Sequence, residues 1–83
     1  MLIGSADVRR LLESDDPGST LAIYQGRAAV ISADDLAADR YPGALSIASQ
    51  REVLDMLGRP VTSEQDLEQL AANLDVAASN LGG

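Results

Sequence analysis

Residues 21–32 read LAIYQGRAAVIS, two short apolar runs on either side of a Gln-Gly pair at 25–26. Glycine at the second central position suits a two-residue hairpin turn, although asparagine is more usual than glutamine at the first. Residues of paired strands then alternate between two faces. One face carries Leu21, Ile23, Ala28 and Val30, and the other carries Ala22, Tyr24, Arg27, Ala29 and Ile31. We predict a hairpin over 20–32, with the first face toward the core and the second partly covered; a three-residue loop with a bulge is the alternative.

A third strand is expected over 44–48, because Leu45 and Ile47 alternate with small residues there. These two side chains should face the core. The sequence leaves open whether this strand pairs with the hairpin or with a second copy of the chain.

The N-terminal segment predicts a short helix over 5–13. Val8, Leu11 and Leu12 recur at helical spacing, and Ser5 stands where an N-cap residue belongs. The stretch SDDPGS at 14–19 should end this helix, because proline disfavours helix at the residue before it and aspartate bonds to its own backbone in turns.

The clearest local signal predicts a helix over 50–57. Ser49 and Glu52 have the spacing of a capping box, and Gly58 stands where a C-terminal cap residue belongs. The apolar stripe of this helix comprises Val53, Leu54 and Leu57.

A longer helix is predicted over 64–81, with Thr62 or Ser63 as its N-cap. Its apolar row comprises Leu67, Leu70, Leu74, Ala77 and Leu81. We expect this row to pack on the domain's own sheet or on the preceding helix. In the alternative interpretation it forms a dimer seam made of Leu67, Leu70, Leu74 and Leu81.

These elements predict one small α+β domain over 1–83, a mainly antiparallel sheet with helices on one face. A chain of 83 residues buries only about 60–70% of the surface that it exposes when unfolded. The chain contains no Phe and no Trp, so the core must consist of Leu, Ile, Val and Ala.

The composition removes most catalytic chemistry. The chain contains no Cys and no His, and all six of its basic residues are arginine. Thiolate and imidazole chemistry, a Schiff-base lysine and a P-loop lysine are therefore excluded. The glycines form no nucleophile elbow or dinucleotide-binding pattern. We expect a protein that is not an enzyme and that needs no cofactor.

The net charge of −7 bears on partners. Nucleic-acid binding needs a basic patch, and the six arginines are scattered, so we expect no direct binding of nucleic acid. One functional alternative is an acidic mimic of nucleic acid, or an antitoxin-like inhibitor of a basic partner. That alternative predicts carboxylates in a regular line on one face.

An acidic cluster at Asp34, Asp35 and Asp39 raises a second alternative, a divalent-metal site made of carboxylates. The spacing matches no EF-hand loop. We therefore favour N-cap and surface roles for these residues, around a short helical turn that includes Leu36.

Four residues are the predicted contacts with a protein partner. Tyrosine and arginine are enriched at interface hot spots, because each buries a large area and retains a hydrogen-bonding tip. The chain's two tyrosines and two nearby arginines have this chemistry: Tyr24, Arg27, Arg40 and Tyr41. In the alternative interpretation Tyr24 only lies across the hairpin from Arg27, and Tyr41 packs on Pro42.

We expect a cytoplasmic location. The segment MLIGSADVRR at 1–10 has no basic residue before its short apolar start, unlike a signal peptide, and no apolar run approaches the length of a membrane-spanning helix.

The run at 24–54, YQGRAAVISADDLAADRYPGALSIASQREVL, contains Tyr-x-Gly-Arg, Arg-Tyr-x-Gly-Ala-Leu and Ser-x-x-Glu in order. This run resembles small acidic, uncharacterised proteins of GC-rich actinobacteria. The resemblance implies a bacterial single-domain protein and no particular activity. With the composition, it leads us to expect a protein-interaction or regulatory accessory module, either binding an unidentified protein or forming a homodimer.

Overall fold

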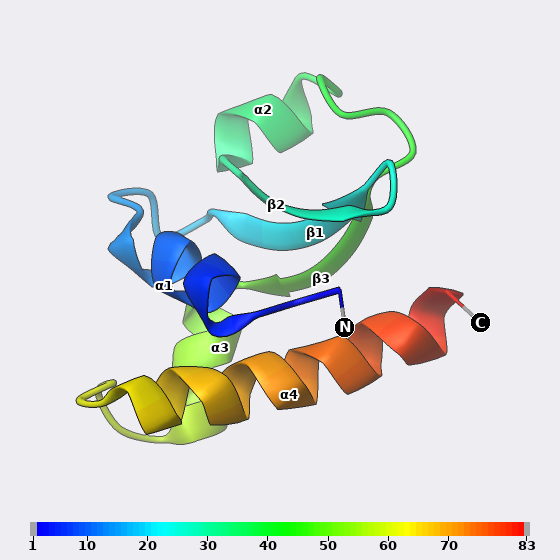
Figure 1. Ribbon diagram of the computed structural model, residues 1–83. Helices are drawn as coiled ribbons and strands as arrows, with labels where there is room; N and C mark the ends of the chain where they lie inside the picture. The colour runs from blue at the N-terminus through cyan, green and yellow to red at the C-terminus, as the bar shows by residue number, and fades with distance from the viewer. Residues whose placement is uncertain (1, 83) are drawn as a thin grey trace.

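The computed structural model describes residues 2–82, with side chains described for residues 2–80. It shows a three-stranded antiparallel sheet, which confirms the predicted α+β class (Figure 1). The prediction that the helices lie on one face is wrong, because the short helix Ala33–Ala37 lies on the side of the sheet opposite the other three. In chain order the elements are α1 (Ser5–Glu13), β1 (Thr20–Tyr24), β2 (Arg27–Ile31), α2 (Ala33–Ala37), β3 (Leu45–Ser49), α3 (Gln50–Leu57) and α4 (Glu64–Gly82).

The hairpin has the predicted register. Leu21 lies opposite Val30, and Tyr24 lies opposite Arg27 across a two-residue turn. Gln25 has φ 52° and Gly26 has φ 78°. Positive φ at both central residues is the mark of a type I′ turn, whose twist matches that of the strands.

Strand β3 pairs with β1 inside the same chain, so the strand order is β2-β1-β3. A bulge interrupts this pairing: Leu21 lies opposite Ala48, whereas Ala22 lies opposite Ser46. The extra residue, Ile47, is half-buried against the core, as expected.

Leu45 corrects the prediction for this strand, because it is 45% exposed rather than part of the core. It occupies the first position of an edge strand and has a neighbouring strand on one side only. The bulge brings Ala48 opposite Leu21 on the core face, where Ala48 is 6% exposed.

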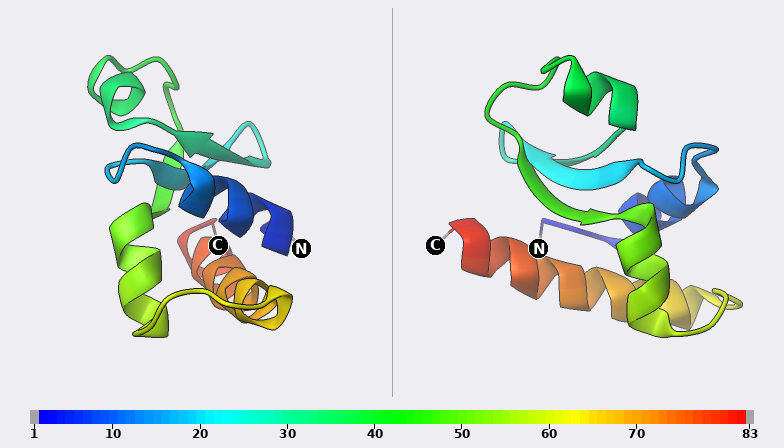
Figure 2. Two further views of the ribbon diagram at one scale, coloured as in Figure 1. Left: turned by 90° about the vertical axis from the view of Figure 1, so that its left-hand side faces the viewer. Right: turned by 180° about the vertical axis from the view of Figure 1, so that it is seen from behind.

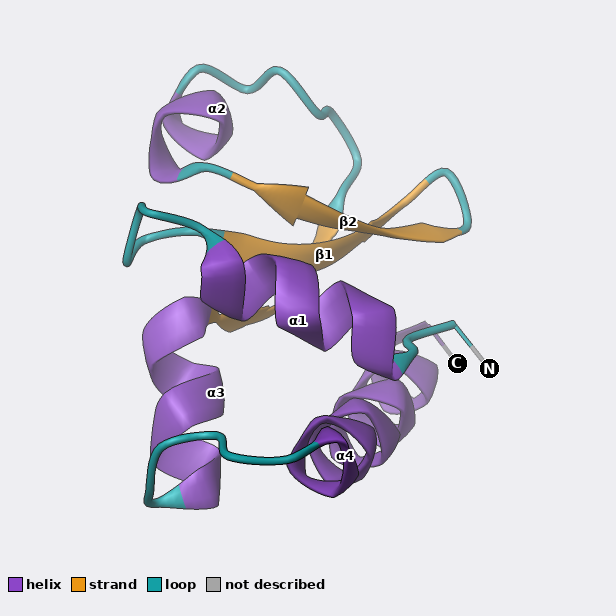
Figure 3. Ribbon diagram, turned by 60° about the vertical axis from the view of Figure 1, so that its left-hand side comes forward, coloured by secondary structure: helices purple, strands orange, loops and turns teal. Residues whose placement is uncertain are grey.

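The core lies between the sheet and the layer formed by α1, α3 and α4 (Figure 2). Helix α1 packs against both the sheet and α4, while α3 follows β3 directly and descends beside α4 (Figure 3). The predicted aliphatic composition holds for the buried cluster, which comprises Ile3, Val8, Leu11, Leu21, Ala48, Val53, Leu67, Leu70, Ala71, Leu74 and Ala78.

The apolar row of α4 packs inside the domain. Leu67, Leu70 and Leu74 are 6%, 1% and 2% exposed. They therefore do not form an exposed dimer seam; their row instead joins the core with α1, α3 and β3. The fourth residue of the predicted seam, Leu81, has a side chain that lies outside the described residues.

The second face of the hairpin is partly covered, as predicted. Ala22 and Ile31 are buried on it, whereas Arg27 near the turn is exposed. Helix α2 and the loop after it lie on this side of the sheet, opposite the other helices (Figures 1 and 2).

Two helix ends differ in part from expectation. Gly4, not Ser5, is the N-cap of α1, and the Asp7 carboxylate accepts the Gly4 N–H at 2.9 Å. Helix α3 has the predicted capping box, and Gly58 with φ 75° is its C-terminal cap as predicted. Leu54, however, is 40% exposed rather than part of a buried stripe. Leu54 is out of phase with Val53, the residue of this helix that enters the core.

Candidate interaction site

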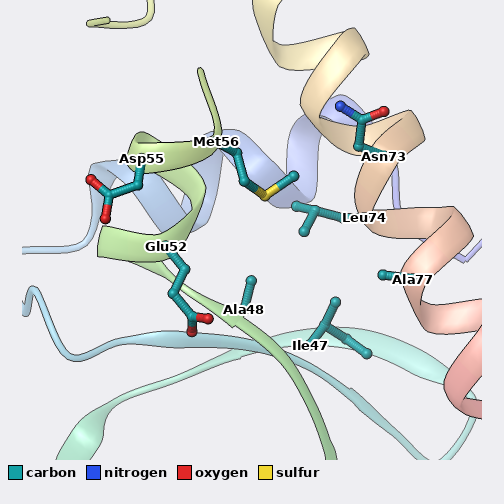
Figure 4. A pocket seen from close by; sticks show the side chains of 8 residues that line it. All are labelled: Ile47, Ala48, Glu52, Asp55, Met56, Asn73, Leu74 and Ala77. Atoms are coloured by element: carbon teal, nitrogen blue, oxygen red, sulfur yellow. The ribbon is translucent and has the colours of Figure 1, made fainter. Parts of the chain in front are cut away.

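An open groove lies where β3 runs into α3 and both meet the flank of α4 (Figure 4). Its volume is about 470 Å³. The residues that line it are Ile47, Ala48, Glu52, Asp55, Met56, Asn73, Leu74 and Ala77.

The helical phase of α3 and α4 places these side chains. On α3, Val53 enters the core, so Met56, three residues later, lies on the adjoining flank. On α4, Leu74 enters the core, and Ala77 lies three residues farther along on the groove side. Figure 4 shows Met56 pointing from α3 toward Leu74, above Ile47 of β3.

The floor of the groove is apolar and open to solvent. Met56 is 49% exposed, while Ile47 and Ala77 are half-buried. A methionine side chain has flexible torsions and a polarizable sulfur, so it adapts to differently shaped partners.

The rim contributed by α3 is acidic. The Glu52 carboxylate accepts the Ser49 N–H at 3.0 Å, which fixes its position at the start of the helix. Asp55 is exposed and points away from the floor (Figure 4). The only other polar side chain of the lining belongs to Asn73, so no lining residue is basic.

The predicted partner contacts lie on the opposite side of the sheet. The rings of Tyr24 and Tyr41 meet edge to face, with centroids 5.2 Å apart and planes at 87°. Arg27 is exposed at the start of β2, and the Nε of Arg40 lies 3.2 Å from Oδ1 of Asp35. The structure thus brings together the two tyrosines, which lie 17 positions apart in the sequence. It pairs Arg40 with Asp35 of the preceding helix, α2.

The acidic cluster at Asp34, Asp35 and Asp39 does not converge on a common point. Asp35 pairs with Arg40, and Asp39 ends the helical turn in the left-handed region at φ 54°. Among residues 2–82 no group of three His, Cys, Asp or Glu side chains is arranged to hold a metal ion.

Three other carboxylates have lowered pKa values, and each joins segments of the fold. Hydrogen bonds from the Ala33 and Gly18 N–H groups lower the pKa of Asp16. Hydrogen bonds from the Ile3 and Leu2 N–H groups do the same for Asp75. These contacts connect the loop after α1 to α2, and the N-terminal segment to α4.

The third is Asp66, which is 5% exposed in the first turn of α4. The guanidinium of Arg59 binds its two oxygens at 2.9 and 2.6 Å, and the Thr62 N–H adds a bond of 3.1 Å. The hydrogen bonds from Arg59, then that from Thr62, hold the pKa of Asp66 far below its usual range. This pair holds the connection between α3 and α4 against the first turn of α4.

Sequence reasoning did not find the groove, because its walls come from two separated segments, 47–56 and 73–77. The sequence signal for the groove is Met56, an apolar residue of α3 outside the predicted stripe, together with Ala77, which the periodicity predicts in the core row. Ala78 takes the core position instead, with 3% exposure.

No protein-family model, curated protein or solved structure matches this chain. Within residues 2–82, no helix has the length and apolar character needed to cross a membrane.

Proposed function

We propose that this chain is a non-enzymatic, cytoplasmic protein-interaction module that binds a protein partner through the groove between α3 and α4. The observation that carries the proposal is the half-exposed apolar floor formed around Met56, Ile47 and Ala77. Most of the chain's large aliphatic side chains are needed to build its small core, yet these remain accessible beside it. An accessible apolar floor with a polar rim is typical of a protein-binding surface.

The three carboxylates with shifted pKa values give no support to acid catalysis. A general acid that works near neutral pH needs a raised pKa. Asp16, Asp66 and Asp75 have pKa values shifted in the opposite direction, by hydrogen bonds that serve the fold.

The distribution of the acidic residues gives little support to a mimic of nucleic acid. Many carboxylates bind groups of the same chain instead of forming a line on one face: Asp7, Asp16, Asp35, Glu52, Glu64, Asp66 and Asp75. A basic protein partner remains consistent with the net charge of −7.

The proposal is tested with two matched variants of α3. Met56→Gln places a polar amide in the groove, whereas Leu54→Gln makes the same type of change at a residue of similar exposure that does not line it. Immobilised wild type and both variants would be used to capture partners from cells that express the protein naturally. A bound protein would then be purified and its Kd measured against each form.

We expect a partner that binds the wild type and Leu54→Gln with similar Kd, and Met56→Gln at least about tenfold more weakly. Thermal unfolding checks that both variants fold. Equal binding by all three forms would contradict the groove as the binding surface. A fourth form, Tyr24→Ala, tests the tyrosine pair. If this variant loses binding while Met56→Gln still binds like the wild type, the function belongs to the tyrosine pair instead.

A further inference from the structure

We infer that the occupant of the groove is a basic amphipathic helix of another protein, with an apolar row seated on the floor and Lys or Arg residues facing the α3 rim. This inference rests on the proposed function and specifies the class of partner.

The position of the groove suits a helix. Its floor lies between α3 and α4, so a third helix placed there would pack against two existing ones. Recognition of this kind uses apolar anchors at spacings of three and four residues. The groove volume of about 470 Å³ accommodates only a few such anchors. We therefore expect a small interface and a Kd in the micromolar range.

The charge of the groove selects the polar side of that helix. Glu52 and Asp55 flank the floor on α3, and no lining residue is basic. The chain as a whole carries −7, so its long-range field attracts a cationic segment and repels an acidic one.

A second copy of this chain is a poor occupant by the same reasoning. Two copies would each bring a charge of −7 to the contact. Four of the six arginines that could neutralise this charge already form ion pairs with carboxylates of their own chain: Arg9, Arg10, Arg40 and Arg59. The longest helix, α4, has acidic residues in its first turn and no basic residue in its last turn.

The test uses three fluorescein-labelled peptides of about 18 residues, the length of five helical turns. The first has leucines spaced three and four residues apart and lysines on the opposite face. The second has the same composition in an order that destroys this spacing. The third keeps the leucines and replaces every lysine with glutamate. Fluorescence anisotropy gives Kd for each peptide, at about 50 mM and about 300 mM salt.

The first peptide should bind with a Kd of the order of 10–100 µM at low salt, and more weakly at high salt. The scrambled and acidic peptides should bind at least about tenfold more weakly. Chemical shifts of backbone amides should change along 47–56 and 73–77. Comparable binding by the acidic peptide would overturn the inference that the partner segment is basic. Comparable binding by the scrambled peptide would overturn the inference that it is an amphipathic helix.

Variants of the protein separate the rim charge from the net charge. Glu52→Gln with Asp55→Asn removes two charges at the groove, and glutamine still serves in the capping box. Asp34→Asn with Asp39→Asn removes two charges from α2 and the loop after it, a segment that lies on the other side of the sheet. The first pair should raise Kd by about three- to tenfold and the second by less than about twofold. Equal changes in Kd for the two double variants would show that the peptide is attracted by net charge alone. That result would overturn the groove as its binding site.

Two outcomes distinguish this inference from the proposed function. A natural partner that depends on Met56 but presents no basic helix would overturn the inference and leave the proposed function standing. Self-association that Met56→Gln abolishes, measured by light scattering across concentrations, would instead assign the groove to a second copy of the chain. Failure of every partner and peptide to distinguish Met56→Gln from Leu54→Gln would overturn both.

Discussion

The edge-to-face contact of Tyr24 and Tyr41 is the one aromatic contact among the described residues, in a chain without Phe or Trp. This contact links the loop after α2 to the hairpin, close to the hairpin turn. Edge-to-face pairs at this separation contribute about 0.5–1.5 kcal/mol beyond the area that they bury.

We therefore expect the variants Tyr24→Leu and Tyr41→Leu to be non-additive. Urea unfolding of the wild type, both single variants and the double variant should give a coupling free energy of about 0.5–1.5 kcal/mol. Tyr24→Leu combined with Gln69→Ala on α4 serves as the control, and should be additive within about 0.5 kcal/mol. Additive behaviour of the tyrosine pair would show that the ring contact contributes nothing to stability.

The hairpin turn gives a second prediction at this scale. Gln25 adopts φ 52°, a left-handed conformation that costs most side chains about 1–2 kcal/mol and that asparagine tolerates far better. Gln25→Asn should raise the free energy of unfolding by about 0.5 kcal/mol, as measured by urea denaturation. Gln25→Val, which places a β-branched residue at positive φ, should lower it; the opposite order would show that the turn has another conformation.

Individual residues of the sheet and of α3 show which features of the structure can be predicted from the sequence. The hairpin register could be predicted because a two-residue turn fixes every pair that follows it. The burial of Ala48 could not be predicted, because it depends on a bulge at Ile47 and nothing in ALSIAS signals the extra residue. The exposure of Leu45 could not be predicted either, because it follows from the position of β3 at the edge of the sheet. Met56 and Leu54 have similar exposure, and only the position of α4 makes one of them part of a groove.

At the scale of whole elements, Gln50 connects the start of α3 to the end of α1. Its Nε2 donates to the carbonyl oxygens of Leu11 and Ser14, both at 2.9 Å. These carbonyls belong to the C-terminal end of α1, where helical partners are missing. The sequence showed the helices and their caps, since those depend on neighbours within a few residues, but not this contact between residues 36 or more positions apart.

Gln50→Ala should lower the free energy of unfolding by about 1–3 kcal/mol, because it leaves partly buried carbonyl groups without a donor. Gln50→Glu keeps the shape but replaces the donor with an acceptor, so it should destabilise the fold at least as much. Gln69→Ala, at an exposed position of α4, should change stability by less than about 0.5 kcal/mol. A Gln50→Glu variant as stable as the wild type would show that the amide does not donate to α1.

At the scale of the whole molecule, carboxylates hold together segments that regular structure does not connect. Asp75 binds the N-terminal segment to α4, Asp16 binds the loop after α1 to the start of α2, and Asp66 binds the connection between α3 and α4. Sequence reasoning predicted the helical position of Asp66 and the turn contacts of Asp16, because both involve adjacent residues. The long-range contacts of Asp16 and Asp75 depend on the packing of the finished fold.

These carboxylates determine how stability depends on pH. The pKa of each is lower in the folded protein than its ordinary value of 3.8. Each therefore stabilises the fold above that value, and its contribution is lost as pH falls below it toward the lower folded pKa, because the unfolded chain binds protons first. The chain contains no His, so no side chain with an ordinary pKa titrates between about pH 5.5 and 7.5.

We expect the free energy of unfolding to be nearly constant between about pH 5.5 and 7.5 and to fall steadily below about pH 4.5. Asp75→Asn should be less stable than the wild type at pH 7, because the neutral amide accepts the Leu2 and Ile3 N–H groups less strongly than the carboxylate does. This difference should shrink below pH 4, where the wild-type carboxylate also becomes protonated. Urea unfolding at closely spaced pH values measures both effects, and Gln69→Ala, which changes no ionisable group, should show a difference from wild type that does not vary with pH. A difference between Asp75→Asn and wild type that stays constant down to pH 2 would show that this carboxylate does not hold the N-terminal segment through its charge.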